Sequence, residues 1–145
     1  MVAYNQLQTD DCGDCLSSCI ESILHLPLGT LPRPVDGDLD TEDGWFGYRE
    51  RLRRALQPLN AWLVEIPSRD DDGASIYPPG WTIGGFAKPA YLPTNRLHAL
   101  VCRDGVPVHD PHPGFRRLVG LEEWGRPLCY DIVCPIDPRR PVGHS

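Results

Sequence analysis

Sixteen prolines and fourteen glycines divide this chain into short segments, and they limit most strongly what it can fold into. Proline interrupts helices and central strands, and glycine favours turns, so we expect long irregular connections around a modest amount of regular structure. The chain has 145 residues, of which 41% are hydrophobic and 23% are charged, which is enough for one buried core. The sequence therefore predicts a single loop-rich domain over residues 1–145.

The clearest helical pattern lies near the N-terminus. Apolar side chains recur there at i, i+3, i+4, i+7 and i+8, namely at Leu16, Cys19, Ile20, Ile23 and Leu24. This spacing predicts a helix over residues 14–25 with one face in the core. We expect the carboxylate of Asp14 to cap its first turn and Pro27 to stop it.

A second helix is expected over residues 41–57. Its buried side would carry Trp45, Tyr48, Leu52 and Leu56. Its arginines are expected mostly in solvent, and they are Arg49, Arg51, Arg53 and Arg54. Alternating or apolar runs predict strands over residues 61–66, 81–86, 98–103, 106–110 and 129–136. The pattern is typical of an α+β domain.

The turn between the third and fourth expected strands decides whether His98 and Asp110 can meet. A two-residue turn would direct His98 away from Asp110. A three-residue loop over 103–105 would pair Cys102 with Val106 and place His98 opposite Asp110. We expect the three-residue loop, because the chemistry described next requires His98 and Asp110 to meet. Directly opposed side chains lie close enough for a carboxylate to reach an imidazole.

A candidate nucleophile lies at the start of the first expected helix. The partial positive charge and free N–H groups of a helix start favour ionisation of the Cys15 thiol. His98 can take the thiol proton, and Asp110 can hold the imidazole in the required tautomer. The backbone N–H of Cys15 and the side-chain amide of Gln8 or Gln6 are candidate donors to an oxyanion. These residues predict acyl transfer through a thioester.

Two blocks of motif residues lie toward the two ends of the chain. They include Gln8-Thr9, Gly13-Asp14-Cys15, Cys19-Ile20, Leu31-Pro32, Pro79-Gly80-Trp81, His98-Ala99-Leu100-Val101 and His109-Asp110-Pro111. The blocks resemble those of small papain-like proteins of bacteria and phages, within the papain-like cysteine peptidase superfamily. They are similar, more distantly, to the bacteriocin-leader-processing peptidases, which cut after double glycine. The resemblance implies a papain-like fold, in which the N-terminal helix bearing the cysteine packs on an antiparallel sheet bearing the histidine and the aspartate.

The two groups of relatives differ in where they place the nucleophile. The leader peptidases match Cys12, with Gln6 six residues upstream, whereas the small papain-like proteins match Cys15, with Gln8 seven residues upstream. We expect Cys15 to be the nucleophile, because the helix start controls thiolate formation. Cys12 and Gln6 are the alternative nucleophile and oxyanion residue.

The substrate cleft is expected next to the histidine strand. Trp81, Gly84 and Gly85 of the expected strand 81–86, together with the loop 89–95, are the candidates to line it. The expected substrate is a peptide or another amide, or an acyl thioester, free or bound to a carrier. No cofactor or metal is required for this chemistry.

Two other functions fit part of the sequence. The same thioester can pass its acyl group to an amine, as an acyltransferase that forms an amide bond in a biosynthetic pathway would do. Cys12 and Cys15 also form a CxxC pair, which is typical of redox or zinc sites. A zinc site would need Cys129 and Cys134 as a second pair of ligands, and a thioredoxin-type motif would need a preceding strand, which the sequence does not predict.

The remaining thiols and imidazoles are assigned no chemistry. Cys19, Cys102 and Cys134 are expected to be small buried residues. His109 and His112 are expected in loops or at the surface, with His109 on the face opposite to His98.

Charge and hydropathy exclude other classes of function. The net charge is −6, with acidic residues concentrated at 36–43 and 70–72, which argues against nucleic acid as a partner. The N-terminus lacks the pattern of a signal peptide, and no apolar run approaches the length that spans a membrane. We therefore expect a cytoplasmic protein without a membrane partner.

Overall fold

One antiparallel sheet organises the structure, a computed structural model that describes residues 1–7, 14–35, 37–87 and 97–143. Its strands are β1 (Ala61–Pro67), β2 (Trp81–Phe86), β3 (His98–Arg103), β4 (Val106–His109) and β5 (Cys129–Pro135). They are arranged in the order β1-β5-β2-β3-β4, and every neighbouring pair is antiparallel. The α+β class is as the sequence predicted.

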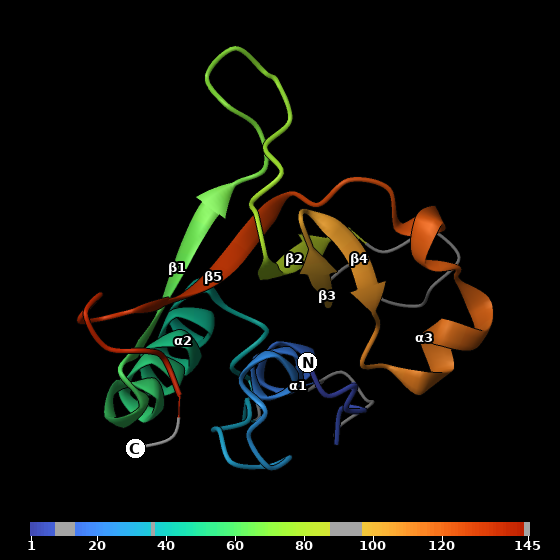
Figure 1. Ribbon diagram of the computed structural model, residues 1–145. Coiled ribbons are helices and arrows are strands. Elements are labelled where there is room, and N and C mark those ends of the chain that lie inside the picture. Colours follow the sequence, from blue (N-terminus) through green and yellow to red (C-terminus); the bar gives the residue numbers. More distant parts are fainter. Residues whose placement is uncertain (8–13, 36, 88–96, 144–145) are drawn as a thin grey trace.

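The helices lie on both sides of this sheet (Figure 1). They are α1 (Cys15–Leu24), α2 (Glu42–Leu56) and α3 (Pro113–Leu118), with two short 3-10 turns, η1 (Gln57–Leu59) and η2 (Leu121–Trp124). The expected bounds of α1, α2 and all five strands agree with the structure to within one residue at each end. Within the described ranges, no helix is both long enough and apolar enough to cross a membrane.

Helices α1 and α2 cover the same face of the sheet. Their apolar stripes meet the inward-facing residues of β1, β2 and β3 in one buried cluster, which includes Leu16, Cys19, Ile20, Leu52, Leu56, Leu63, Ile83 and Val101. The 3.6-residue period of the helices and the two-residue period of the strands bring these side chains together. This cluster is the main core, and it fixes the position of the first turn of α1.

The segment that contains α3 and η2 covers the opposite face near β2 and β3. A second buried cluster forms there from Phe86, Leu100, Cys102, Val119, Trp124 and Tyr130. The sequence did not predict α3 or η2. One signal was available: Pro113 follows His112, whose Nδ1 accepts a hydrogen bond from the backbone N–H of Phe115 at 3.1 Å. A proline at the first helical position after a capping side chain is typical of a helix start.

Two expectations for α2 were wrong. Trp45 is 37% exposed rather than buried. Arg49 is buried, because its guanidinium binds the carboxylate of Asp131 on β5 through two hydrogen bonds of 3.0 and 2.6 Å. Since Asp131 points from the sheet toward α2, it requires a positive partner on that side of the helix, and the sequence pattern of α2 contains no sign of this.

The turn between β3 and β4 has two residues, not the three that we expected. Asp104 and Gly105 have φ angles of 51° and 81°, as in a type I′ turn, and Arg103 pairs with Val106. A Cβ atom on Gly105 would also lie 2.9 Å from the backbone of Tyr77. Glycine is therefore required at this position both by the backbone angle and by the close approach of a neighbour.

A β-bulge follows this turn. Pro107 pairs with Cys102, but the next pair joins His109 to Val101, so Val108 is an extra residue on β4. An extra residue in one strand exchanges the faces to which all the following side chains point.

The bulge decides where Asp110 points. Without it, Asp110 would lie opposite Ala99 and face α1. With it, Asp110 falls opposite Leu100, on the same face as His98, and the two side chains meet. The expected contact is present, but a bulge produces it rather than a longer turn.

Candidate active site

Cys15 is the first residue of α1, and its side chain is partly exposed. The backbone N–H of Ala99 on β3 donates to its Sγ at 3.4 Å. One helical turn later, the Sγ of Cys19 donates to the carbonyl oxygen of Ala99 at 3.6 Å. An N–H group directed at sulfur favours the thiolate. The two cysteines thus fix α1 on β3 at the residue that follows His98.

His98 and Asp110 form a buried pair. The Nε2–H of His98 donates to Oδ1 of Asp110 at 2.6 Å, and the two residues are 2% and 1% exposed. The same oxygen accepts a hydrogen bond from the backbone N–H of His112 at 2.9 Å. Burial opposes a charged ring, but hydrogen bonds to Asp110 and to Cys15 raise the pKa of His98 to about 9. The imidazolium is therefore the favoured form at neutral pH.

Aromatic rings enclose the imidazole of His98. The ring centroids of Phe115 and Trp124 each lie 5.1 Å from it, and that of His112 lies 6.2 Å away. These rings come from the segment that contains α3 and η2, which the sequence did not predict. They keep water away from the Asp110 hydrogen bond, and the low dielectric strengthens it.

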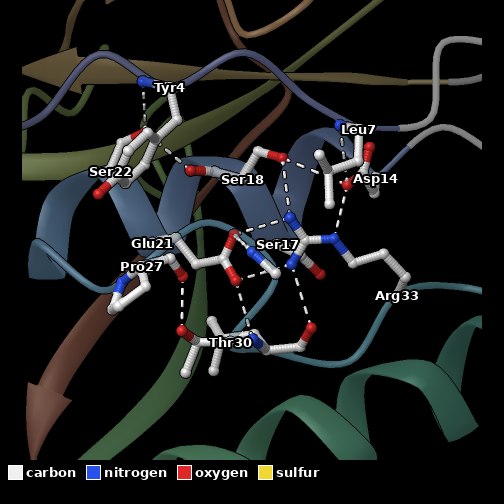
Figure 2. Close-up of polar contacts among 12 residues, drawn as sticks. Tyr4, Leu7, Asp14, Ser17, Ser18, Glu21, Ser22, Pro27, Thr30 and Arg33 are labelled. Carbon is white, nitrogen blue, oxygen red and sulfur yellow. Dashed lines mark hydrogen bonds and ion pairs between the residues drawn. The ribbon is translucent and has the colours of Figure 1, made fainter.

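The carboxylate of Asp14 does not cap α1, contrary to our expectation. Its Oδ2 accepts hydrogen bonds from Nε of Arg33 at 2.6 Å and from the backbone N–H of Leu7 at 3.2 Å (Figure 2). A charged partner is a stronger donor than the backbone N–H groups of the first turn, and Arg33 lies close only because the loop after α1 returns along the helix.

The N-terminal segment passes beside the Asp110 turn. Gln6 is buried, and its backbone N–H donates to the carbonyl oxygen of Pro111 at 2.8 Å. His109 is buried rather than superficial, because its Nε2 donates to the carbonyl oxygen of Tyr4 at 2.7 Å. Gln6, the alternative oxyanion residue, is thus attached next to the candidate site.

Three further expectations fall on residues outside the described ranges. They concern Gln8 as the oxyanion residue, Cys12 as the alternative nucleophile, and the loop 89–95 as part of the cleft.

Trp81 is not brought to the site. It pairs with Arg103 at the far end of β2, and the Arg103 guanidinium lies 4.7 Å from the centre of its ring. His98 pairs with Phe86, five residues further along β2. At about 3.3 Å per residue, Trp81 lies about 17 Å from His98 along the strand.

Gly84 and Gly85 lie closer to the histidine. Gly85 pairs with Ala99, the residue whose backbone N–H contacts Cys15, and Gly84 pairs with Leu100. A Cβ atom on Gly85 would lie 2.9 Å from the Sγ of Cys129. The glycine is thus required for packing between β2 and β5, whether or not substrate passes over it.

The second pair of cysteine ligands that a zinc site would need does not assemble. Cys129 and Cys134 are five residues apart on β5, and strand alternation puts them on opposite faces of the sheet. The described residues contain no cluster of three or more side chains suited to hold a metal ion.

Cys15, His98 and Asp110 come from three separate segments and meet at one end of β3. Comparisons of the chain with protein-family models, with curated proteins and with solved structures find no match.

Proposed function

We propose that this protein is a papain-like cysteine enzyme that transfers acyl groups through a thioester. Cys15 is the nucleophile, His98 is the general base and acid, and Asp110 orients the imidazole. The proposal depends on one observation, the continuous chain from the Asp110 carboxylate through the His98 ring to the Cys15 thiol. The substrate class is a peptide or another amide, or an acyl thioester, free or carried by a second protein.

The first half of the reaction makes the thioester. The Cys15 proton passes to His98, and the thiolate attacks the substrate carbonyl carbon to form a C–S bond while the carbonyl electrons move to oxygen. The backbone N–H of Cys15 and a glutamine amide, from Gln6 or Gln8, stabilise the resulting oxyanion. When the carbonyl re-forms, the bond to the leaving nitrogen breaks, and the amine takes the proton from His98.

The second half releases the acyl group. His98 removes a proton from water, which attacks the thioester carbon, and the C–S bond breaks to give the acid and the free thiol. An amine in place of water gives a new amide bond, which is the acyltransferase version of the same cycle. Acyl-enzyme isolated by gel filtration and then mixed with buffer alone or with an added amine separates the two by the mass of the product.

The protonation state of the pair supports this cycle. Because the pKa of His98 is raised to about 9, the ring can hold the proton released by Cys15 at neutral pH. An imidazolium next to sulfur lowers the thiol pKa in turn, so the two groups favour a thiolate–imidazolium pair. Coupled groups of this kind titrate as a pair. The fall in the alkylation rate of Cys15 toward acidic pH therefore reports the ionisation of the pair.

Alkylation tests the proposal without a known substrate. We expect iodoacetamide at pH 6 to label Cys15 more than about tenfold faster than Cys129, because only a thiolate reacts. Cys129 is a slow reference in the same chain, since it is also partly exposed but burial raises its pKa to about 11. His98→Ala is the matched control, because it removes only the imidazole beside Cys15. Peptide mass spectrometry assigns the label to each cysteine, including Cys12.

Two variants complete this test. His98→Ala should slow the labelling of Cys15 at pH 6 by at least about tenfold relative to wild type, and Cys12→Ala should leave it unchanged. Equal rates for Cys15 and Cys129 in the wild-type protein would refute the assignment of Cys15 as nucleophile. Preferential labelling of Cys12 would transfer that role to Cys12.

A further inference from the structure

A second charged cluster lies directly before the nucleophile, around Arg33 in the loop that follows α1 (Figure 2). Its Nε donates to Oδ2 of Asp14 at 2.6 Å, while its two terminal nitrogens donate to the two carboxylate oxygens of Glu21, each at 2.7 Å. The side chains of Asp14 and Glu21 are both fully buried, and that of Arg33 is 13% exposed. A single guanidinium thus serves two buried carboxylates.

Glu21 fixes the position of this guanidinium. Its carboxylate also accepts hydrogen bonds from the backbone N–H groups of Leu31, at 2.8 Å, and Gly29, at 3.2 Å. These bonds hold the returning loop against the middle of α1. Arg33 is therefore presented to Asp14 in one orientation, and Asp14 is the residue immediately before Cys15.

Cys15 acts electrostatically on Cys19 of α1, on the hydroxyl of Tyr48 on α2 and on His98 of β3. The charges of Asp14, Asp110 and Arg33 each act on at least one of these same three groups. Burial raises the pKa of Tyr48. The charges of Cys15 and Asp14 raise this pKa further, and the charge of Arg33 lowers it. One buried hydroxyl thus senses Arg33, Asp14 and the nucleophile together.

A carboxylate beside a thiol disfavours ionisation of the thiol, because two negative charges then share a space of low dielectric. Cys15 has Asp14 next to it in the chain and Asp110 behind His98. His98 compensates for Asp110 through their direct hydrogen bond. The corresponding partner of Asp14 is Arg33.

We propose that Arg33 is a positioning residue for the reaction proposed above: it offsets the charge of Asp14 and so allows Cys15 to pass its proton to His98. This role rests on the proposed function and adds to it a residue in a loop that the motif pattern did not single out. Arg33 does not touch the substrate. It acts on the ionisation of the nucleophile through Asp14.

The test measures the rate of alkylation of Cys15 by iodoacetamide as a function of pH, with thermal unfolding as a check that each variant folds. The comparison is made at the pH at which wild-type Cys15 reacts at half its plateau rate. Arg33→Gln removes the charge, Arg33→Lys keeps it without the guanidinium fork, and Asp14→Asn removes the carboxylate. We expect the rate to fall about fivefold in Arg33→Gln, to stay near wild type in Arg33→Lys, and to rise by up to about twofold in Asp14→Asn, because at this pH a rise of about one unit in the thiol pKa lowers the thiolate fraction from one half to about one eleventh.

A purely structural role predicts another pattern. Loss of the fork would then slow labelling equally in Arg33→Lys and Arg33→Gln, and Asp14→Asn would slow it as well; either result overturns the proposal. If Arg33→Gln does not fold, Asp14→Asn decides alone: a rise in rate supports the proposal and a fall refutes it.

The outcome is separable from that of the proposed function. If wild-type Cys15 reacts no faster than Cys129, the assignment of the nucleophile fails. The ratios among Arg33→Gln, Arg33→Lys and Asp14→Asn still report whether Arg33 controls ionisation of Cys15, because alkylation requires no substrate.

Discussion

Replacing Asp110 with asparagine tests whether the carboxylate sets the charge of the buried imidazole. The pKa of His98 rises from its ordinary value of 6.5 to about 9, a difference of about 2.5 units. At 1.36 kcal/mol per unit, the folded state prefers the imidazolium by about 3 kcal/mol. Hydrogen bonds to Asp110 and Cys15 both contribute to this preference against the cost of burial. We expect Asp110→Asn to remove most of it.

The sign of the pH dependence follows from proton uptake. In the thiolate–imidazolium pair the His98 proton comes from Cys15, so the wild-type pair holds no more protons than the same two residues do in the unfolded chain. The experiment is therefore made with Cys15→Ala in both proteins. Between pH 6.5 and the raised pKa of His98, the folded Cys15→Ala protein keeps the His98 proton, while the unfolded chain has lost it. The stabilisation is therefore fully present below pH 6.5 and is lost as the pH rises through about 9. The free energy of unfolding of Cys15→Ala should fall by up to about 3 kcal/mol across this window, and that of the double variant Cys15→Ala with Asp110→Asn should fall much less.

Urea denaturation at pH 6 and at pH 9.5, at equal ionic strength, measures both values. Buried thiols also make stability fall at high pH, because burial raises the pKa of Cys102 to about 12 and that of Cys19 well above its usual value. This contribution is the same in both proteins and cancels in the difference between them. Equal losses of stability in Cys15→Ala and in the double variant would refute the reasoning.

Three further changes test other parts of the fold and the site. Arg49→Met should lower the free energy of unfolding by about 3–5 kcal/mol, because Asp131 is left buried without its partner, and adding Asp131→Leu should restore most of it; chemical denaturation measures both. Deletion of Val108 removes the bulge and should turn Asp110 toward α1, so that rapid alkylation of Cys15 is lost while the far-UV circular dichroism spectrum is kept; an unchanged rate would contradict the register. Trp124→Ala should admit water to the imidazole and abolish its slowly exchanging Nε2–H signal in proton NMR, whereas Trp124→Phe should retain that signal; its survival in both variants would show that the aromatic cover is not what excludes water.

Local patterns were enough to predict most of the secondary structure. Helix α1 followed from apolar residues spaced by three and four, and its end followed from Pro27. The apolar or alternating runs gave all five strands. These signals are reliable because each depends on residues a few positions apart, whose burial the backbone period itself dictates.

The cover over His98 was not predictable in this way. Helix α3 has six residues and no apolar stripe, so its position depends on contacts with β2 and β3 rather than on its own pattern. Arg49 was misjudged for the same reason. Its partner Asp131 lies 82 residues away in the chain, and no local period reveals such a distant ion pair.

The sequence by itself determined which residues are suited to the chemistry: a cysteine at a helix start, a histidine at the start of a strand, and an aspartate after the next strand. Only the tertiary structure decided that they meet. The two-residue turn alone would have directed Asp110 away from His98, and a single extra residue, Val108, reversed it. Strand register is set by the packing of each face of the sheet against the helices and loops that lie on it. A shift of one position decides which side chains come into contact, and the alternating pattern does not reveal such a shift.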